Sequence, residues 1–329
     1  MTERVRVGIA GLGSYVPDRV VTNEYFAEVL DTSHEWIVQR TGICERRFAA
    51  EDQATSDLAL IAAQRALANA GKSPEDVDLI ITGTLTPDYL LPGSSVLVQD
   101  RLGAKNAATF DVNTACTGFL TALHAAEAFV AAGRAKCVVA IGAETLSRFL
   151  DMQDRSSAIL FGDGAGAAVI TPWEDCRQGE VLKTTQGTDG SLYNIIHMEG
   201  GGSRLPPTHQ TVDDERHFIS LRGREVYRFA VTKMAGLITE MLEGYTDEDI
   251  GIVIPHQVNA RIIESAIERI GLPREKVMIN IDKFANTSAA TVPMAWDQAI
   301  REDRMVKDKL VILVAFGAGV TWGATLLRW

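Results

Sequence analysis

Cys116 stands where an apolar, strand-like stretch ends and a helix-like stretch begins, within Asp111-Val-Asn-Thr-Ala-Cys-Thr-Gly-Phe119. Unpaired N–H groups and the positive end of the dipole at a helix N-terminus stabilise an anion. We therefore expect this thiol to be more acidic than a free one, whose pKa is about 8.5, and able to act as a nucleophile. Position alone is equally compatible with a structural cysteine, because free Cys is often buried.

Two residues in the C-terminal part could serve such a thiol. His256 ends the apolar run Ile250–Pro255, and Asn286 begins a helix-like segment. Taken singly, a histidine at a strand end is more often a hydrogen-bonding structural residue, and Asn is an ordinary helix N-cap. A catalytic role is predicted for them only as a set with Cys116, because a nucleophile needs partners that handle protons and charge.

The composition is that of an ordinary protein with a sizeable core. The 329 residues are 46% hydrophobic and 23% charged, which suits one large or two closely joined domains. The net charge of −11 argues against nucleic acid as the main partner. Four cysteines without a C-x-x-C pair indicate neither a zinc site nor disulfides and fit the reducing cytoplasm. We expect no membrane insertion, because no apolar run approaches roughly 20 residues and no signal-peptide pattern is present.

Strand-like and helix-like runs alternate along the first half, so the fold class is α/β. The strand-like runs are Val5–Ala10, Leu79–Thr82, Thr109–Val112, Cys137–Ile141 and Gly166–Ile170. The helix-like runs are Thr55–Ala70, Gly93–Leu102 and Gly118–Ala132.

The second half repeats this scheme. Val77–Gly83 corresponds to Ile250–His256, and Val138–Glu144 corresponds to Leu313–Gly319. We predict two α/β halves, residues 1–175 with the nucleophilic Cys and residues 176–329 with the His and Asn, packed about a pseudo-dyad. Ligands of α/β sheets bind at the carboxyl ends of strands, so this packing would bring Cys116, His256 and Asn286 together.

Glycine-rich stretches are the remaining motifs. Gly8–Val16 lacks the third glycine of a dinucleotide-binding loop, and Phe161–Gly166 leads into a strand-like run, so neither indicates a nucleotide cofactor. Phe316-Gly-Ala-Gly-Val-Thr-Trp-Gly323 joins two strand-like runs. A turn so free of side chains could bring backbone N–H groups close to a ligand oxygen, and we predict that it forms part of an oxyanion hole.

These motifs together resemble those of the thiolase-fold condensing enzymes. Thr-Ala-Cys116-Thr-Gly-Phe, Pro-His256-Gln-Val-Asn, Asn286-Thr-Ser-Ala-Ala and the Phe316–Gly323 turn occur in the family's order and spacing. With the segment from Trp36 to Ile43, they narrow the resemblance to the β-ketoacyl-acyl-carrier-protein synthase III group, over Val5 to Trp329. The resemblance implies a thiolase-like fold, in which two pseudo-dyad-related halves form αβαβα layers, and a homodimer.

The resemblance also implies an activity, the step that initiates fatty acid synthesis. Cys116 would take the acyl group of an acyl-CoA, and His256 and Asn286 would promote decarboxylation of malonyl-acyl-carrier-protein. The backbone N–H groups of Cys116 and Ala318 would hold the oxyanion that forms as the carbanion attacks. The products would be 3-oxoacyl-acyl-carrier-protein, CoA and CO₂, without a metal or organic cofactor.

Further binding residues are implied in the same way. The CoA site would contain Trp36, Arg40, Thr41, Arg155 and Asn259. Acyl carrier protein would meet Arg228 and Arg261, despite the negative total charge. Leu91 would border the acyl pocket across the dimer interface. Since Leu91 is smaller than the Phe of some members, we expect a pocket that accepts more than acetyl.

Other functions are compatible with the same motifs. A related condensing enzyme or acyltransferase of secondary metabolism would use the same Cys, His and Asn. A degradative thiolase would need a second catalytic Cys near the C-terminus, and none follows Cys176. A non-catalytic scaffold would not need a thiol at a helix terminus with both partners.

Overall fold

The first of two large β-sheets has five strands, in the order β1-β7-β6-β4-β5, and two further sheets have two strands each. The computed structural model describes residues 4–329. In this sheet β1, β7 and β6 pair antiparallel, whereas β6, β4 and β5 pair parallel. The strands are β1 (Val7–Tyr15), β4 (Leu79–Gly83), β5 (Ala108–Val112), β6 (Val138–Thr145) and β7 (Asp163–Pro172). The predicted strands of the first half are thus confirmed, with β1, β6 and β7 longer than expected.

The second sheet reproduces this plan with four strands, in the order β11-β12-β13-β8. They are β8 (Glu180–Thr188), β11 (Ile250–Pro255), β12 (Leu310–Gly317) and β13 (Thr321–Arg328). The counterpart of β5 is a single parallel bridge between Val253 and Val277. Beyond this bridge, the N–H of Asn280 donates to the side chain of Gln257, at 3.0 Å, and not to the backbone of β11.

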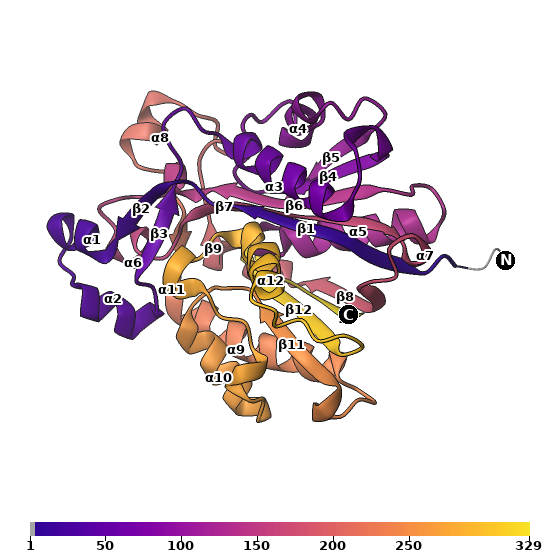
Figure 1. Ribbon diagram of the computed structural model, residues 1–329. Helices are drawn as coiled ribbons and strands as arrows, with labels where there is room; N and C mark the ends of the chain where they lie inside the picture. Colours follow the sequence, from indigo (N-terminus) through magenta and orange to yellow (C-terminus); the bar gives the residue numbers. More distant parts are fainter. Residues whose placement is uncertain (1–3) are drawn as a thin grey trace.

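Helices complete five layers, αβαβα, as predicted (Figure 1). The middle layer packs against both sheets, and its side chains form the central core with them. Two outer layers, of two helices each, cover the outer faces of the first and the second sheet. The middle helices are α5 (Gly118–Ala131) and α12 (Thr291–Arg301), and the outer ones are α3 (Thr55–Ala70) with α4 (Ser94–Leu102) and α9 (Gly223–Met241) with α10 (Ala260–Ile270). The predicted bounds of α3 are confirmed at both ends.

The distribution of apolar and polar side chains on each helix matches the layer in which the helix lies. Ten of the fourteen residues of α5 are buried, because the helix is covered on both sides. In α10, Ile262, Ile263, Ala266 and Ile267 are buried whereas Arg261 and Glu268 are exposed. An apolar stripe of this kind suits a helix that covers one face of a sheet.

Short elements form a cap beside the strand ends. Apart from the helix His209–Asp213, they share a small apolar core that includes Phe26, Ile37 and Phe161. The cap elements are β2 (Arg19–Thr22), α1 (Asn23–Val29), α2 (His34–Thr41), β3 (Glu45–Phe48), α6 (Arg155–Ala158), β9 (Ile196–His197), α8 (His209–Asp213), β10 (Ser220–Leu221) and α11 (Ile281–Phe284).

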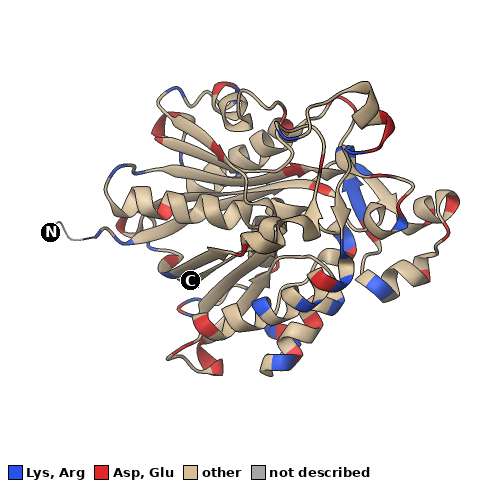
Figure 2. Cartoon of the chain, turned by 180° about the vertical axis from the view of Figure 1, so that it is seen from behind, with Lys and Arg blue, Asp and Glu red and all other residues tan. Residues whose placement is uncertain are grey.

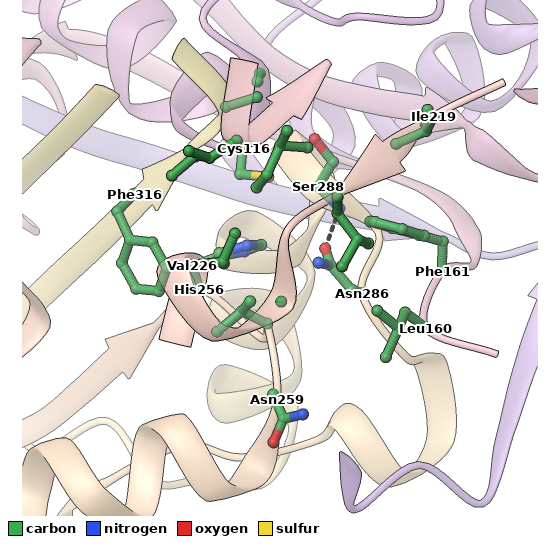
Figure 3. A pocket seen from close by; sticks show the side chains of 18 of the residues that line it. Cys116, Leu160, Phe161, Ile219, Val226, His256, Asn259, Asn286, Ser288 and Phe316 are labelled. Atoms are coloured by element: carbon green, nitrogen blue, oxygen red, sulfur yellow. Dashed lines mark hydrogen bonds between the residues drawn. The ribbon is translucent and has the colours of Figure 1, made fainter. Parts of the chain in front are cut away.

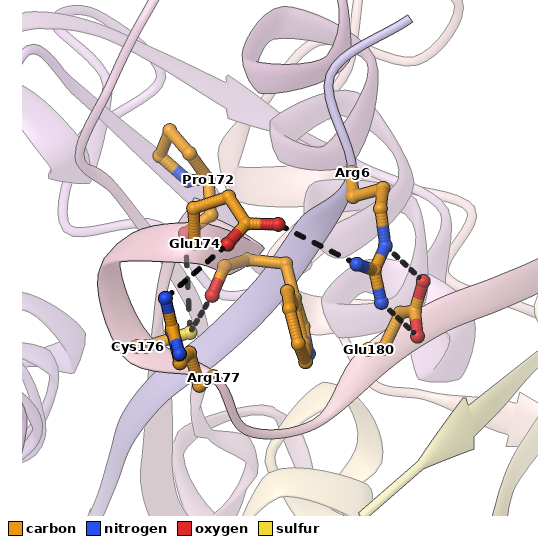
Figure 4. Close-up of polar contacts among 7 residues, drawn as sticks. Arg6, Pro172, Glu174, Cys176, Arg177 and Glu180 are labelled. Atoms are coloured by element: carbon orange, nitrogen blue, oxygen red, sulfur yellow. Dashed lines mark hydrogen bonds and ion pairs between the residues drawn. The ribbon is translucent and has the colours of Figure 1, made fainter.

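An arginine joins the two halves at the chain connection between them, which contains α7 (Trp173–Cys176). The guanidinium of Arg6 donates to both carboxylate oxygens of Glu180, at 2.7 and 2.8 Å, and lies 3.5 Å from Glu174 (Figure 4). The same group lies over the Trp173 ring, 3.7 Å from its centroid. The predicted boundary at residues 175/176 falls in this connection, and the division at that point stays a prediction.

Within residues 4–329, no helix is both long and apolar enough to cross a membrane. The cytoplasmic location expected from the cysteine spacing stays a prediction.

Replacing Gly142 by Ala tests how closely the halves approach. A Cβ at Gly142 would lie 2.2 Å from the carbonyl oxygen of Ala289, so backbone must shift, and we expect a loss of about 1–3 kcal/mol of stability. Gly236, exposed in α9 with open space around its Cβ position, is the matched control. Its replacement by Ala should stabilise the protein by about 0.5–1 kcal/mol. Urea unfolding measures both, and equal effects of the two variants would contradict the close approach.

Candidate active site

Cys116, His256 and Asn286 line one cavity between the halves (Figure 3). Cys116 lies in the 3-10 turn Ala115–Thr117, between β5 and α5. His256 directly follows β11, and Asn286 precedes the 3-10 turn Ser288–Ala290 that leads into α12. All three lie beyond strand ends or before the two central helices. The structure therefore brings together the three residues that the sequence analysis selected.

Most other side chains around the cavity are apolar. They include Leu85, Leu146, Leu160, Phe161, Ile195, Ile196, Ile219, Leu221, Val226, Phe229, Val258, Ile262 and Phe316. A cavity with this lining suits a hydrocarbon chain or another apolar group, with the few polar side chains fixing its orientation.

The loop after β12 approaches Cys116 closely. A Cβ at Gly317 would lie 2.7 Å from the backbone nitrogen of Cys116, so a residue with a side chain does not fit there. The backbone N–H groups of Cys116 and Ala318 face the sulfur, where each lowers the thiol pKa. Two converging N–H donors beside a nucleophile are the geometry that an oxyanion requires.

The expectation of an acidic thiol is wrong for this structure. Cys116 keeps some accessible surface toward the cavity, but the protein packed around it raises its pKa to about 11. Ser288 and the backbone N–H groups lower the pKa, and the carboxylate of Glu144 raises it, so burial dominates. The free energy needed to remove a thiolate from water is larger than the stabilisation that the partial charges at the start of α5 provide.

His256 is buried and neutral. Its Nδ1 lies 2.7 Å from the hydroxyl of Thr291, which can also donate to the carbonyl oxygen of Ser288, at 3.0 Å. Its Nε2 has no hydrogen-bond partner among residues 4–329. Burial lowers the pKa of His256 to about 3, because an imidazolium would lose its hydration. One ring nitrogen is therefore anchored, and the other is available to a ligand.

Asn286 is held by its own turn. Its Oδ1 accepts a hydrogen bond from the N–H of Ser288, at 2.8 Å, as the dashed line in Figure 3 marks. Its backbone pairs with Leu160 and Gly162. The side-chain Nδ2, a donor of two hydrogen bonds, has no partner within the described chain and is available in the cavity.

Backbone strain surrounds the cavity. Ala115, Ala285, Ser288 and Val320 have φ of 49°, 55°, 48° and 50°, in the region that L-residues with side chains disfavour. Such conformations persist where the surrounding packing imposes them, often at functional sites. Here they place the backbone before Cys116 and around Ser288.

Four of the five residues predicted to bind CoA lie together. Trp36 has Arg40 and Arg155 over its ring, 5.6 and 4.7 Å from the centroid. Asn259 lines the cavity and donates to the carbonyl oxygen of Arg40, at 3.1 Å, which places this cluster next to the cavity. Thr41 differs, since its buried hydroxyl bonds Ile37 and Ile43 and so closes the turn after α2.

Three other predicted residues lie outside the cavity. Leu91 is 88% exposed and does not line it in its own chain. Arg228 on α9 and Arg261 on α10 are exposed. The helices in the lower part of the view in Figure 2 carry both Lys or Arg and Asp or Glu residues, so basic residues are interspersed with acidic ones there.

The sequence analysis missed Ser288, Thr291 and Glu144. Ser288 belongs to the quoted Asn-Thr-Ser motif, and Thr291 follows three residues later, so their spacing could have drawn attention to them. Glu144 stands near the end of an apolar strand, and only the packing of that strand shows what its carboxylate faces. Within residues 4–329 no group of three His, Cys, Asp or Glu side chains is arranged to hold a metal ion.

Comparisons with known proteins point to one family. A family model for 3-oxoacyl-[acyl-carrier-protein] synthase III matches residues 110–190, and the model for its C-terminal part matches residues 242–329. The β-ketoacyl-[acyl-carrier-protein] synthase III of Caldanaerobacter subterraneus is 47% identical over 100% of this chain and 99% of the relative. That of Clostridioides difficile is 47% identical over 98% of both chains.

Solved structures give the same result. The 3-oxoacyl-[acyl-carrier-protein] synthase III of Aquifex aeolicus has a TM-score of 0.90 at 43% identity, over 98% of this chain and 100% of that one. The priming β-ketosynthase of the R1128 polyketide pathway has a TM-score of 0.90 at 34% identity, over 100% and 98%. The layered fold and the cavity with Cys, His and Asn thus define a thiolase-fold condensing enzyme, an acyltransferase. Within that class, the chain belongs to the β-ketoacyl-[acyl-carrier-protein] synthase III family.

The pKa of His256 predicts a pH-dependent contribution to stability. Unfolded His has a pKa of about 6.5, and the folded value is about 3. Between these values the unfolded chain binds a proton that the folded one does not, so stability falls as the pH falls. Relative to His256→Asn, the wild type should lose an additional ~1.4 kcal/mol per pH unit from pH 6 to 4. Urea unfolding measures this difference, and parallel curves for the two proteins would contradict a buried neutral imidazole.

Proposed function

We propose that this protein catalyses the decarboxylative condensation of an acyl-CoA primer with malonyl-acyl-carrier-protein, as the initiating synthase of fatty acid synthesis. The convergence of Cys116, His256 and Asn286 in one apolar cavity carries the proposal. Its products are 3-oxoacyl-acyl-carrier-protein, CoA and CO₂. The names and identities of its relatives support the choice of substrates.

In the first half-reaction, the sulfur of Cys116 attacks the thioester carbonyl of the acyl-CoA. The N–H groups of Cys116 and Ala318 stabilise the tetrahedral oxyanion, and collapse releases CoA and leaves an acyl-Cys. A thiol suits this task because it is both a good nucleophile and a good leaving group.

In the second half-reaction, malonyl-acyl-carrier-protein occupies the emptied cavity. Nδ2 of Asn286 and Nε2 of His256 donate to its thioester carbonyl and stabilise the enolate as CO₂ departs. When the Thr291 hydroxyl turns its proton toward Nδ1, the neutral ring carries its own proton on Nε2, as this role requires. The carbanion then attacks the acyl-Cys carbonyl and frees Cys116.

The substrates reach the cavity past the cluster of Trp36, Arg40, Arg155 and Asn259. The indole and the guanidinium groups suit an adenine ring and phosphates, so we assign this cluster to CoA. In a homodimer the exposed Leu91 of one chain completes the acyl pocket of the other. Neither half-reaction draws on a metal or an organic cofactor.

Intact-protein mass spectrometry tests the function and names the primer. Acetyl-, isobutyryl- and octanoyl-CoA are each mixed with the enzyme, followed by malonyl-acyl-carrier-protein. We expect an acyl adduct on the wild type that the chase discharges, and no adduct on Cys116→Ala. His256→Ala should still form the adduct but discharge it about 10²-fold or more slowly, because an oxyanion donor is lost. A wild type that forms no adduct with any acyl-CoA would contradict the proposed donor.

The carrier-protein contact can be tested separately. Arg228→Glu should raise the KM for malonyl-acyl-carrier-protein by about tenfold and leave adduct formation from acyl-CoA unchanged, because the residue is exposed on α9, outside the cavity. Arg134→Glu is the matched control, because Arg134 is also exposed but follows the C-terminal end of α5, whereas Cys116 precedes its N-terminal end. An equal rise in KM for both variants would show a general charge effect and contradict a specific patch.

The relative from the R1128 polyketide pathway supports one second candidate, a priming synthase of secondary metabolism. The same chase distinguishes the two functions when it is run with carrier proteins of both kinds. Preferred discharge by the fatty acid carrier would favour the initiating synthase.

A further inference from the structure

Glu144 is a fully buried carboxylate that neither half-reaction uses. It stands near the end of β6, and its Oε2 accepts four hydrogen bonds, from the N–H of Leu85 and Thr86 and the hydroxyls of Thr84 and Thr86, at 2.7–3.2 Å. Its Oε1 has no partner among residues 4–329. An orphaned buried carboxylate oxygen is costly, so this second oxygen needs an explanation.

Ser288 lies near the Glu144 carboxyl and the thiol, because the turn Ser288–Ala290 packs against both β6 and the turn that holds Cys116. Its hydroxyl lowers the pKa of both Glu144 and Cys116, yet it completes a hydrogen bond with no residue of the described chain. The turn that carries it sits directly on β6, because Gly142 has no side chain to hold Ala289 away. A hydroxyl can accept one proton and donate another, and this one is left free to do both.

The first half-reaction needs such a group. The thiol of Cys116 must lose its proton although burial raises its pKa to about 11, and His256, with a pKa of about 3, is a poor acceptor. Burial raises the pKa of Glu144 to about 7, and its negative charge also opposes a thiolate. A proton passed from the thiol to the carboxylate would keep a single negative charge in the cluster.

Few other ionisable groups are near Glu144. On the neighbouring strand β7, the carboxylate of Asp163 is occupied by Ser147 and the N–H of Ala49. The loop and the turn packed against the Glu144 carboxyl present hydroxyl and amide groups, from Thr84, Thr86 and Ser288. The charge of Glu144 raises the pKa of Cys116.

We propose that Glu144 receives the proton of Cys116 through the hydroxyl of Ser288 as the thiol attacks. Resting on the proposed function, this path makes both residues part of the acyl-transfer machinery. The Cys116 S–H bond breaks, its proton passes to Ser288 Oγ, and the hydroxyl proton passes to Glu144 Oε1. The electron pair left on sulfur forms the bond to the acyl carbon.

The protons balance over the full cycle. The CoA sulfur leaves with the electron pair of the broken C–S bond and takes one proton from solvent, which is the proton that decarboxylative condensation consumes. Glu144 keeps its proton while Cys116 is acylated. When the product forms, Cys116 leaves as a thiolate and recovers that proton through Ser288.

Glu144→Gln tests the path without removing the scaffold. The amide oxygen can still accept from the Thr84 and Thr86 groups, while the amide nitrogen can only donate toward Ser288. At pH 7.5 we expect acyl-Cys formation to slow about 10²-fold, the size of a general-base contribution. The wild-type rate should level off above about pH 7, whereas the variant's rate should keep rising to pH 9.

Ser288→Ala interrupts the same path at a second point, because it removes the hydroxyl that would pass the proton on. It should slow acylation to a similar extent, and the double variant should be no slower than the slower single one, because both changes interrupt one path. Glu127→Gln is the matched control, since Glu127 is also a buried carboxylate but pairs with Arg4. It should acylate as the wild type does.

A second readout separates this proposal from the proposed function. Alkylation of Cys116 by iodoacetamide needs the same deprotonation but no substrate, and it should slow at pH 7.5 in both single variants. Slower alkylation without any acyl adduct on the wild type would support the path and contradict the function. The path would be overturned if Glu144→Gln were alkylated and acylated as fast as the wild type, or if its acylation rate still levelled off near pH 7. It would also be overturned if the rate losses of the two single variants multiplied in the double variant.

Discussion

The close approach of the two central helices to both sheets is the constraint on which the rest of the structure depends. A Cβ at Gly83 would lie 2.2 Å from the backbone of Gly118, and one at Gly142 equally close to Ala289. These contacts fix the start of α5 and the turn before α12 against the first sheet. Because Cys116 precedes one helix and Asn286 the other, packing that holds the core together also sets the geometry of the cavity.

Burial sets the protonation states of the ionisable groups in the site. It keeps His256 neutral and makes Cys116 a weak acid, so the fold does not store a thiolate in the resting state. In the proposed reaction, hydrogen-bond donors that are already in place, from Ala318 and Asn286, act on charge only when it develops on a substrate. Water need not be reorganised at that moment, which is the advantage of a preorganised site. The cost is that a proton must be moved inside the protein, and Glu144 is the buried group suited to hold it.

Specificity lies in separate parts of the molecule. The apolar lining suits an acyl chain, the aromatic and basic cluster at Trp36 suits CoA, and the exposed arginines suit an acidic carrier. The family relationship covers the whole chain, and we expect the apolar lining together with the exposed Leu91 to select the primer. Chemistry and substrate choice can therefore change independently on one scaffold.

The sequence by itself determined the α/β class, the repeated halves, most strand positions and the residues Cys116, His256 and Asn286, because periodicity and local motifs are properties of neighbouring residues. Only the tertiary structure decided the reduced fifth strand at Val277, where the side chain of Gln257 takes the place of a neighbouring strand. It also reversed the expected acidity of Cys116 and revealed Glu144. Desolvation and unpaired polar atoms depend on what surrounds a group in space, and a linear pattern does not contain that information.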